Sequence, residues 1–139
     1  MLRVTTAATA EPITVDDVKV ILRLDDSGFD TVLPAMIAAA REIVEQQTGL
    51  ALATATYEWT PTAGRTEPLP LLPATVTSDE GVYPITLQTT AALAPAALKA
   101  AMYLLVGDML ANTEASTEQA LIENPALERL IAPYRRVLS

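Results

Sequence analysis

The chain has 139 residues and a formal net charge of −8, and it contains neither cysteine nor histidine. The missing side chains exclude disulfides, a thiol nucleophile, a Cys/His zinc site and a Ser-His-Asp triad. The balance of 17 Asp and Glu against 9 Lys and Arg argues against general nucleic-acid binding and electrostatic membrane anchoring, because both need clustered positive charge.

The composition predicts one mainly helical domain over residues 1–139. Half of the residues are hydrophobic but only 4% are aromatic, so small aliphatic side chains must form most of the core. The apolar stretch 96–111 is shorter than the roughly 20 residues of a membrane span and carries Lys99 and Asp108. We therefore expect a buried helix there and no membrane association.

The N-terminal part predicts an extended arm followed by a short helix. Residues 1–12 are rich in Thr and Ala and end at Pro12, which disfavours earlier helix formation. A helix over about 14–23 has Thr14 as its N-cap, and Asp17 stands where a capping box usually has Glu.

A longer amphipathic helix is predicted over about 29–48. Apolar residues recur there every three to four positions, and Gly49 is a natural residue to end the helix. Arg41 and Glu45 are four residues apart and can form an ion pair on this helix.

Residues 50–93 predict a small β-hairpin, because several prolines exclude a long helix. The alternation over 54–60 is typical of a strand, and 82–87 is the candidate partner strand.

The C-terminal part predicts two more helices. Pro95 opens a long apolar helix that reaches residue 111, a polar loop covers 112–124, and Pro125 starts a final amphipathic helix that Pro133 ends or kinks. The fold class that follows is mainly α: a small bundle of about four helices, with a short β-hairpin inserted between the second and third helices.

The acidic turn between the first two helices is not predicted to bind metal. Asp25, Asp26 and Asp30 lack the ligand spacing and closing Glu of a calcium loop, so capping and turn roles are favoured. The following helix is too acidic to read DNA, and Glu58 has no second carboxylate to act with it as a catalytic pair. We therefore predict no catalytic, cofactor-binding or metal site, and no enzyme activity.

The tail has basic residues beside apolar ones, and two interpretations stay open. It can be an ordinary last helix packed on its own domain, or a docking segment with apolar anchors and charged edges.

The order of these elements resembles one family, the small head–tail connector proteins (head-completion adaptors) of long-tailed phages, prophages and gene transfer agents. No single motif carries this resemblance, which lies in the order and spacing of several. They are Glu11-Pro12-Ile13-Thr14, Val18-Lys19, Leu22-Arg23-Leu24-Asp25, Ile37-Ala38-Ala39-Ala40-Arg41, Val44-Glu45, Thr48-Gly49, Leu52, Thr56-Tyr57-Glu58-Trp59, Pro95 to Lys99 and Leu130-Ile131-Ala132-Pro133-Tyr134-Arg135. The segment 60–93 departs from the family because it is shorter than the strand-rich segment common in relatives.

The resemblance implies a structural subunit without a cofactor. Such adaptors form a closed ring of roughly twelve copies through head-to-tail contacts. The ring lies below the capsid portal, extends the channel through which packaged DNA passes, and presents a platform to a tail-side stopper or tail-terminator protein. The expected location is the neck of a virion or virus-like particle assembled in the bacterial host cytoplasm. The alternatives are another neck or tail-completion protein, or a small helical protein-interaction scaffold.

Two sets of site residues follow as hypotheses. The portal-docking segment is 125–139, with Leu127, Arg129, Leu130, Ile131, Tyr134, Arg135, Arg136, Val137 and Leu138. The acidic residues expected to line the DNA channel are Asp16, Asp17, Asp25, Asp26, Glu42 and Glu45. An acidic lining favours the passage of DNA because it does not hold phosphates.

Overall fold

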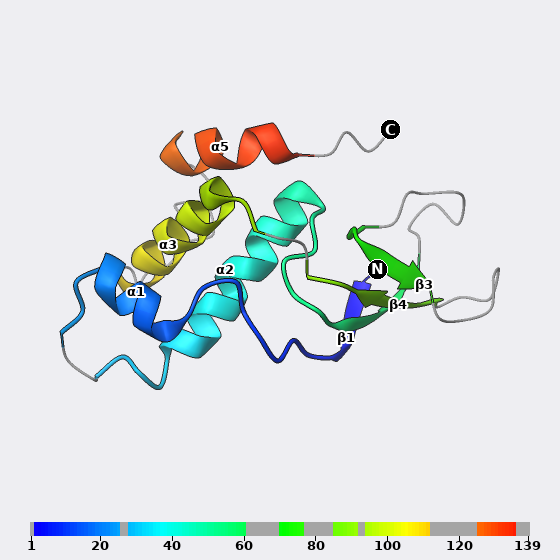
Figure 1. Ribbon diagram of the computed structural model, residues 1–139, viewed down its shortest axis with the longest axis horizontal. Coiled ribbons are helices and arrows are strands. Elements are labelled where there is room, and N and C mark those ends of the chain that lie inside the picture. The colour runs from blue at the N-terminus through cyan, green and yellow to red at the C-terminus, as the bar shows by residue number, and fades with distance from the viewer. Residues whose placement is uncertain are drawn as a thin grey trace.

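The computed structural model describes residues 2–25, 28–60, 70–76, 85–91, 94–111 and 125–135. These residues form helices on one side of the molecule and a β-sheet on the other (Figure 1). In chain order the elements are β1 (Leu2–Thr6), α1 (Val15–Ile21), α2 (Leu33–Thr48), β2 (Thr56–Trp59), β3 (Ala74–Val76), β4 (Ile85–Thr89), α3 (Ala96–Ala111), α5 (Pro125–Ile131) and a short 3-10 helix (Ala132–Tyr134).

The expectation of a helical bundle with only a short hairpin is wrong. Together with the helices, the described residues form a four-stranded antiparallel sheet in the order β1-β2-β4-β3. Residues 2–6, which the sequence suggested as an arm, form β1 and pair with β2, so that Arg3 lies opposite Glu58. The proline-rich segment adds β3 at the other edge. A sheet of this size is stable where an isolated hairpin is marginal, because it presents an apolar face to a core.

The helices begin and end where local signals place them. Before α1, the Thr14 hydroxyl accepts the Asp17 N–H at 3.1 Å, and the Asp17 carboxylate accepts the Thr14 N–H at 3.2 Å. The capping box is therefore complete even with Asp in place of Glu. Helix α2 begins at Leu33, four residues later than expected, with a proline in its first turn. It ends at Thr48 and is capped by Gly49, whose φ of 75° lies in the left-handed region.

Two hydrophobic clusters form the interior. The larger cluster lies between α2, α3 and α5, and it includes the fully buried side chains of Val44, Leu98 and Leu105. The smaller cluster covers the inner face of the sheet around Tyr57 and Leu87. The interior is thus divided into a helical part and a sheet part. Contacts between the segments that join helices and strands must hold these two parts together.

Candidate functional site

The C-terminal segment packs onto its own domain through its apolar residues. Helix α5 lies across α3 (Figure 1), with Leu127 and Ile131 buried in the helical core. Leu130 and Tyr134 are half-buried against the same core. These four residues of the predicted docking set therefore fit the interpretation of a final helix packed on its own domain.

The arginines of the same segment point outward or pair at the surface. Arg129 is exposed. The Arg135 guanidinium pairs with Glu128 and donates to the Gln47 side-chain oxygen on α2 at 3.0 Å. The remaining members of the docking set, Arg136, Val137 and Leu138, lie outside the described residues. In the described part of this segment the surface thus carries Arg129 together with the Arg135–Glu128 ion pair.

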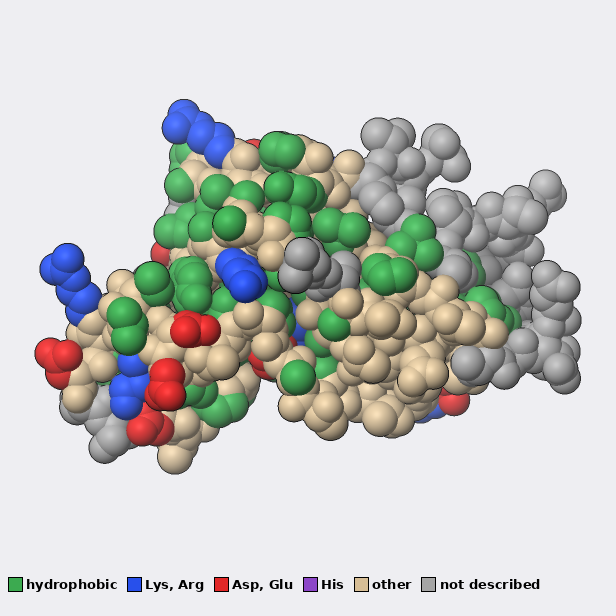
Figure 2. Space-filling model, viewed as in Figure 1, with side chains coloured by type: hydrophobic (Ala, Val, Ile, Leu, Met, Phe, Trp, Pro, Cys, Tyr) green, Lys and Arg blue, Asp and Glu red, His purple; other side chains and the backbone are tan. Residues whose placement is uncertain are grey.

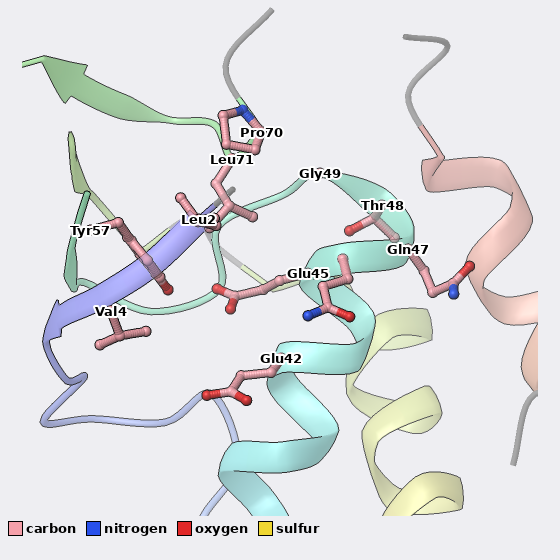
Figure 3. Close-up of a pocket in the computed structure, with 11 residues that line it drawn as sticks. Leu2, Val4, Glu42, Glu45, Gln47, Thr48, Gly49, Tyr57, Pro70 and Leu71 are labelled. Atoms are coloured by element: carbon pink, nitrogen blue, oxygen red, sulfur yellow. The ribbon is translucent and has the colours of Figure 1, made fainter. Parts of the chain in front are cut away.

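The acidic set does not form one patch in the described part of the chain. Asp16 and Asp17 are exposed in the first turn of α1, and Asp25 is exposed just beyond that helix. Glu42 is exposed on α2 and points from that helix toward the side where Val4 lies (Figure 3). Helix α1 and strand β1 lie on opposite sides of α2 (Figure 1), which separates the two groups. Asp26 lies outside the described residues.

Glu45 belongs to an internal ion pair. Its side chain is 3% exposed and accepts from Arg41 Nη1 at 2.7 Å, as the spacing of four residues predicted. Its second oxygen accepts the Leu52 N–H at 2.8 Å. Both carboxylate oxygens are thus engaged inside the domain, and Glu45 is not presented at the surface of the subunit.

Arg41 connects three segments of the chain. Its Nε donates to Glu11 Oε1 at 2.6 Å, and its Nη1 reaches Glu45. Glu11 lies between β1 and α1, and Leu52 lies between α2 and β2. No local pattern predicts the contact between Arg41 and Glu11, because 30 residues separate the two.

The pKa values of this network follow from burial and charge. Burial acts to lower the Arg41 pKa, but the hydrogen bond to Glu11 and the charges of Glu45 and Glu11 together outweigh it and raise the pKa. Burial raises the pKa of the Glu45 carboxyl, and the Leu52 N–H and Arg41 offset only part of that effect. Burial also raises the pKa of Tyr57, and the charge of Glu45 adds to it. The Arg41 guanidinium therefore stays charged, and Glu45 takes up a proton at a higher pH than an exposed Glu does.

A cleft of about 500 Å³ opens between β1 and the C-terminal half of α2 (Figure 3). Its apolar side consists of Leu2, Val4 and Leu71, and its polar side includes Glu42 and Gln46. Within the ranges that the structure describes, no group of three or more Asp, Glu, His or Cys side chains could hold a metal ion. The cleft is suited to contact with a protein segment, because it combines aliphatic side chains with polar ones.

A second, mostly apolar groove of about 720 Å³ lies between the end of α1 and α3. Its lining includes Ile21, Tyr103 and Leu104, with Lys99 and Asp108 among its polar residues. Figure 2 shows hydrophobic side chains gathered over the helical side of the molecule, and charged ones near α1. Among the helices that the structure describes, none combines the length and the hydrophobicity of a membrane span.

Comparisons with known proteins show what this fold resembles. No family model and no curated protein matches the sequence. Among solved structures, a chain from the neck of an empty gene transfer agent (GTA) particle, computed with C6 symmetry, is 20% identical with a TM-score of 0.72. A chain from the virion of a native gene transfer agent particle is 18% identical with a TM-score of 0.69. Each likeness covers 100% of this chain and 97% of the other. The chain therefore has the fold of components of these particles, sheet included.

Proposed function

We propose that this chain is a structural subunit of the neck of a virus-like particle, namely a head–tail adaptor that forms a ring beneath the capsid portal. The ring extends the DNA channel and joins the head to a tail-side stopper or tail-terminator protein. The observation that carries the proposal is the likeness to the neck chain, which has a TM-score of 0.72 over the whole of this chain. The order of the sequence motifs supports the same role.

We propose twelve copies for the ring. The neck structure was computed with C6 symmetry, which fits a ring of six copies or one of twelve with two copies in each symmetric unit. A head-to-tail ring needs two different surfaces on each subunit. Particle mass distinguishes six copies from twelve.

The docking of the ring to the portal is proposed to depend on the C-terminal arginines. Arg129 is exposed, and Arg136 with Val137 and Leu138 follows the described part of the segment. Positive charge on this segment fits an acidic partner surface. The buried Leu127 and Ile131 hold α5 against the helical core, and Arg129 is exposed on the same helix.

The channel is proposed to be lined by acidic residues, which are Asp16, Asp17, Asp25, Asp26 and Glu42 or a part of them. Carboxylates facing the lumen repel the phosphates of passing DNA and prevent tight binding. A ring structure with a basic lumen would contradict this assignment.

The experiment is a pull-down and negative-stain imaging of this protein with the portal protein encoded in the same gene cluster. We expect rings seated on the narrow end of the portal. Deleting residues 126–139 would also remove two core residues, so Arg129→Glu and removal of 136–139 are sharper variants. Arg23→Glu is the matched control. Arg23 is exposed, lies just beyond α1, and is distant from α5 in the sequence. Both C-terminal changes should weaken portal binding, and the control should not.

Two results would replace the proposed role with a different one. Binding to a stopper or tail-terminator protein without binding to the portal would indicate another neck or tail-completion protein. A monomer or dimer that binds no neck component would contradict the neck role and favour a small interaction scaffold.

A further inference from the structure

The sheet has two edges in the described part of the chain, β1 on one side and β3 on the other. An edge strand presents backbone N–H and C=O groups that a further strand can bind. All neighbouring pairs are antiparallel, so the four strands alternate in direction. The two edge strands therefore run in opposite directions. If β3 of one copy is placed beside β1 of the next so that the sheet continues, the two strands are antiparallel.

At alternate residues of β1, the backbone N–H and C=O groups point away from the sheet. The Thr89 N–H donates to the Ala55 carbonyl at 2.9 Å, which fixes the odd-numbered residues of β2 as those bonded to β4. The even-numbered Glu58 then bonds to β1, where it lies opposite Arg3. Leu2 and Val4, on either side of Arg3, consequently point their N–H and C=O groups away from the sheet.

The same reasoning applies to β3. The Thr90 N–H donates to the Pro73 carbonyl at 3.0 Å, so Pro73 and Thr75 face β4. Ala74 and Val76 then point their N–H and C=O groups outward. Leu72, two residues before Ala74, is already bonded to Gly49 and Ala51. Each edge thus offers two residues, spaced two apart, for a short new antiparallel ladder.

The side chains of these residues lie on one face of the sheet. Leu2 and Val4 lie opposite the buried Trp59 and Tyr57, and Val76 lies opposite the buried Leu87. Residues directly opposite one another share a face. The apolar inner face therefore continues to both edges, where Leu2, Val4 and Val76 are 37%, 45% and 39% exposed.

We propose that neighbouring copies of this chain join through these edges. β3 of one copy adds to β1 of the next, with Val76 opposite Leu2 and Ala74 opposite Val4. This register pairs all four outward-pointing residues and brings their side chains together beside the cleft between β1 and α2. The inference rests on the proposed ring, and it identifies the two unlike surfaces that a head-to-tail ring needs. The sheets of all copies become one continuous belt.

The test uses the absence of cysteine from the chain. The proposed register places Arg3 opposite Thr75 of the neighbouring copy at a non-hydrogen-bonded position, where opposite Cα atoms are about 4.5 Å apart, a separation that a disulfide can span. Both side chains are exposed on the outer face of the sheet, so neither substitution opens the core. The double variant Arg3→Cys with Thr75→Cys is oxidised mildly, alone and with the portal protein. It is then analysed on non-reducing gels, with particle mass measured on the same samples.

The expected result is a ladder of covalent multimers larger than dimers from the double variant, because every copy carries both halves of the contact. Arg3→Cys alone and Thr75→Cys alone are the matched controls, and both should stay monomeric on the gel. A second variant, Val4→Pro, removes one outward N–H from the edge and should weaken ring formation, whereas Val4→Thr should leave the ring intact.

Rings without the ladder would overturn the inference and leave the proposed ring standing. Dimers from Arg3→Cys alone would also overturn it, because they would show two β1 strands meeting. A ladder without portal binding would support the strand pairing and remove support for the neck role. Absence of both rings and ladder would overturn the strand pairing.

Discussion

Arg41 carries a charge in the interior and contacts both Glu11 and Glu45. Removing a guanidinium from water costs free energy, and the carboxylates of Glu11 and Glu45 offset that cost, while the Leu52 N–H helps to offset the burial of the Glu45 carboxylate. Together with the Leu52 N–H bond to Glu45, these contacts hold the segment after β1 and the segment before β2 against α2. The residue therefore contributes more to the arrangement of the segments than a surface ion pair of the same spacing would.

Arg41→Ala is expected to destabilise the fold by about 3–5 kcal/mol, because it leaves the Glu45 carboxylate buried without its partner. Chemical denaturation followed by circular dichroism measures the change. The matched control is the double variant Arg41→Met with Glu45→Leu, which removes both charges and should lie much closer to the wild type. A single variant within about 0.5 kcal/mol of the wild type would show that the network does not hold the segments together.

Glu45 predicts a pH dependence of stability with a defined sign. Burial raises its pKa in the folded state above the ordinary value of 4.5, so the folded protein binds this proton more tightly than the unfolded chain. Stability from this group is fully present below pH 4.5 and is lost as the pH rises through the raised pKa.

Glu45→Gln removes this titration and serves as the reference. The free energy of unfolding of the wild type, minus that of the variant, should fall as the pH rises from about 4.5 into the weakly acidic range. Denaturation at a series of pH values measures it. A difference that instead grows with pH would indicate that Arg41 and the Leu52 N–H dominate and lower the pKa.

At the scale of elements, α5 completes the helical core. Leu127→Ala is expected to cost about 2–5 kcal/mol, because it removes a buried side chain from the contact between α5 and α3. Arg129→Ala, on the exposed face of the same helix, should change stability by less than about 0.5 kcal/mol. Thermal unfolding of the two variants measures both effects. Equal effects would mean that α5 is not packed as described.

The helices could be predicted from the sequence because their signals are local. The capping box at Thr14, Gly49 at the end of α2, and the prolines at the starts of α3 and α5 lie within or beside their own helices. Strand β1 has no such signal. All five residues of β1 are exposed, and Arg3 of β1 lies 55 residues from its partner Glu58. The strand therefore depends on contacts that a short stretch of sequence does not contain.

The candidate site was predictable only in part, for a related reason. The spacing of Arg41 and Glu45 predicted their ion pair, but their burial depends on Glu11 and on the backbone of Leu52. Glu45 therefore looked like one more solvated acid. The apolar positions of the last helix were evident, but only packing against α3 shows that Leu127 serves the core of this domain.

At the scale of the whole molecule, the two hydrophobic clusters are predicted to unfold together as one domain. Trp59, the single tryptophan, lies in the sheet cluster, whereas circular dichroism reports mainly on the helices. Because Arg41 and its partners join the two parts, fluorescence and circular dichroism should give coincident denaturation curves. Two separate transitions would instead divide the chain into two units.

The pairing of β1 with β2 also has a consequence for the order of folding. Bringing together partners 55 residues apart has a closure cost of about 3.5 kcal/mol in chain entropy, which a few hydrogen bonds recover only when β2 is already held in place. During synthesis β1 leaves the ribosome well before β2, and β2 in turn needs β4. We therefore expect β1 to dock late in folding and to open first, so that its amide hydrogens exchange with solvent faster than those of β4.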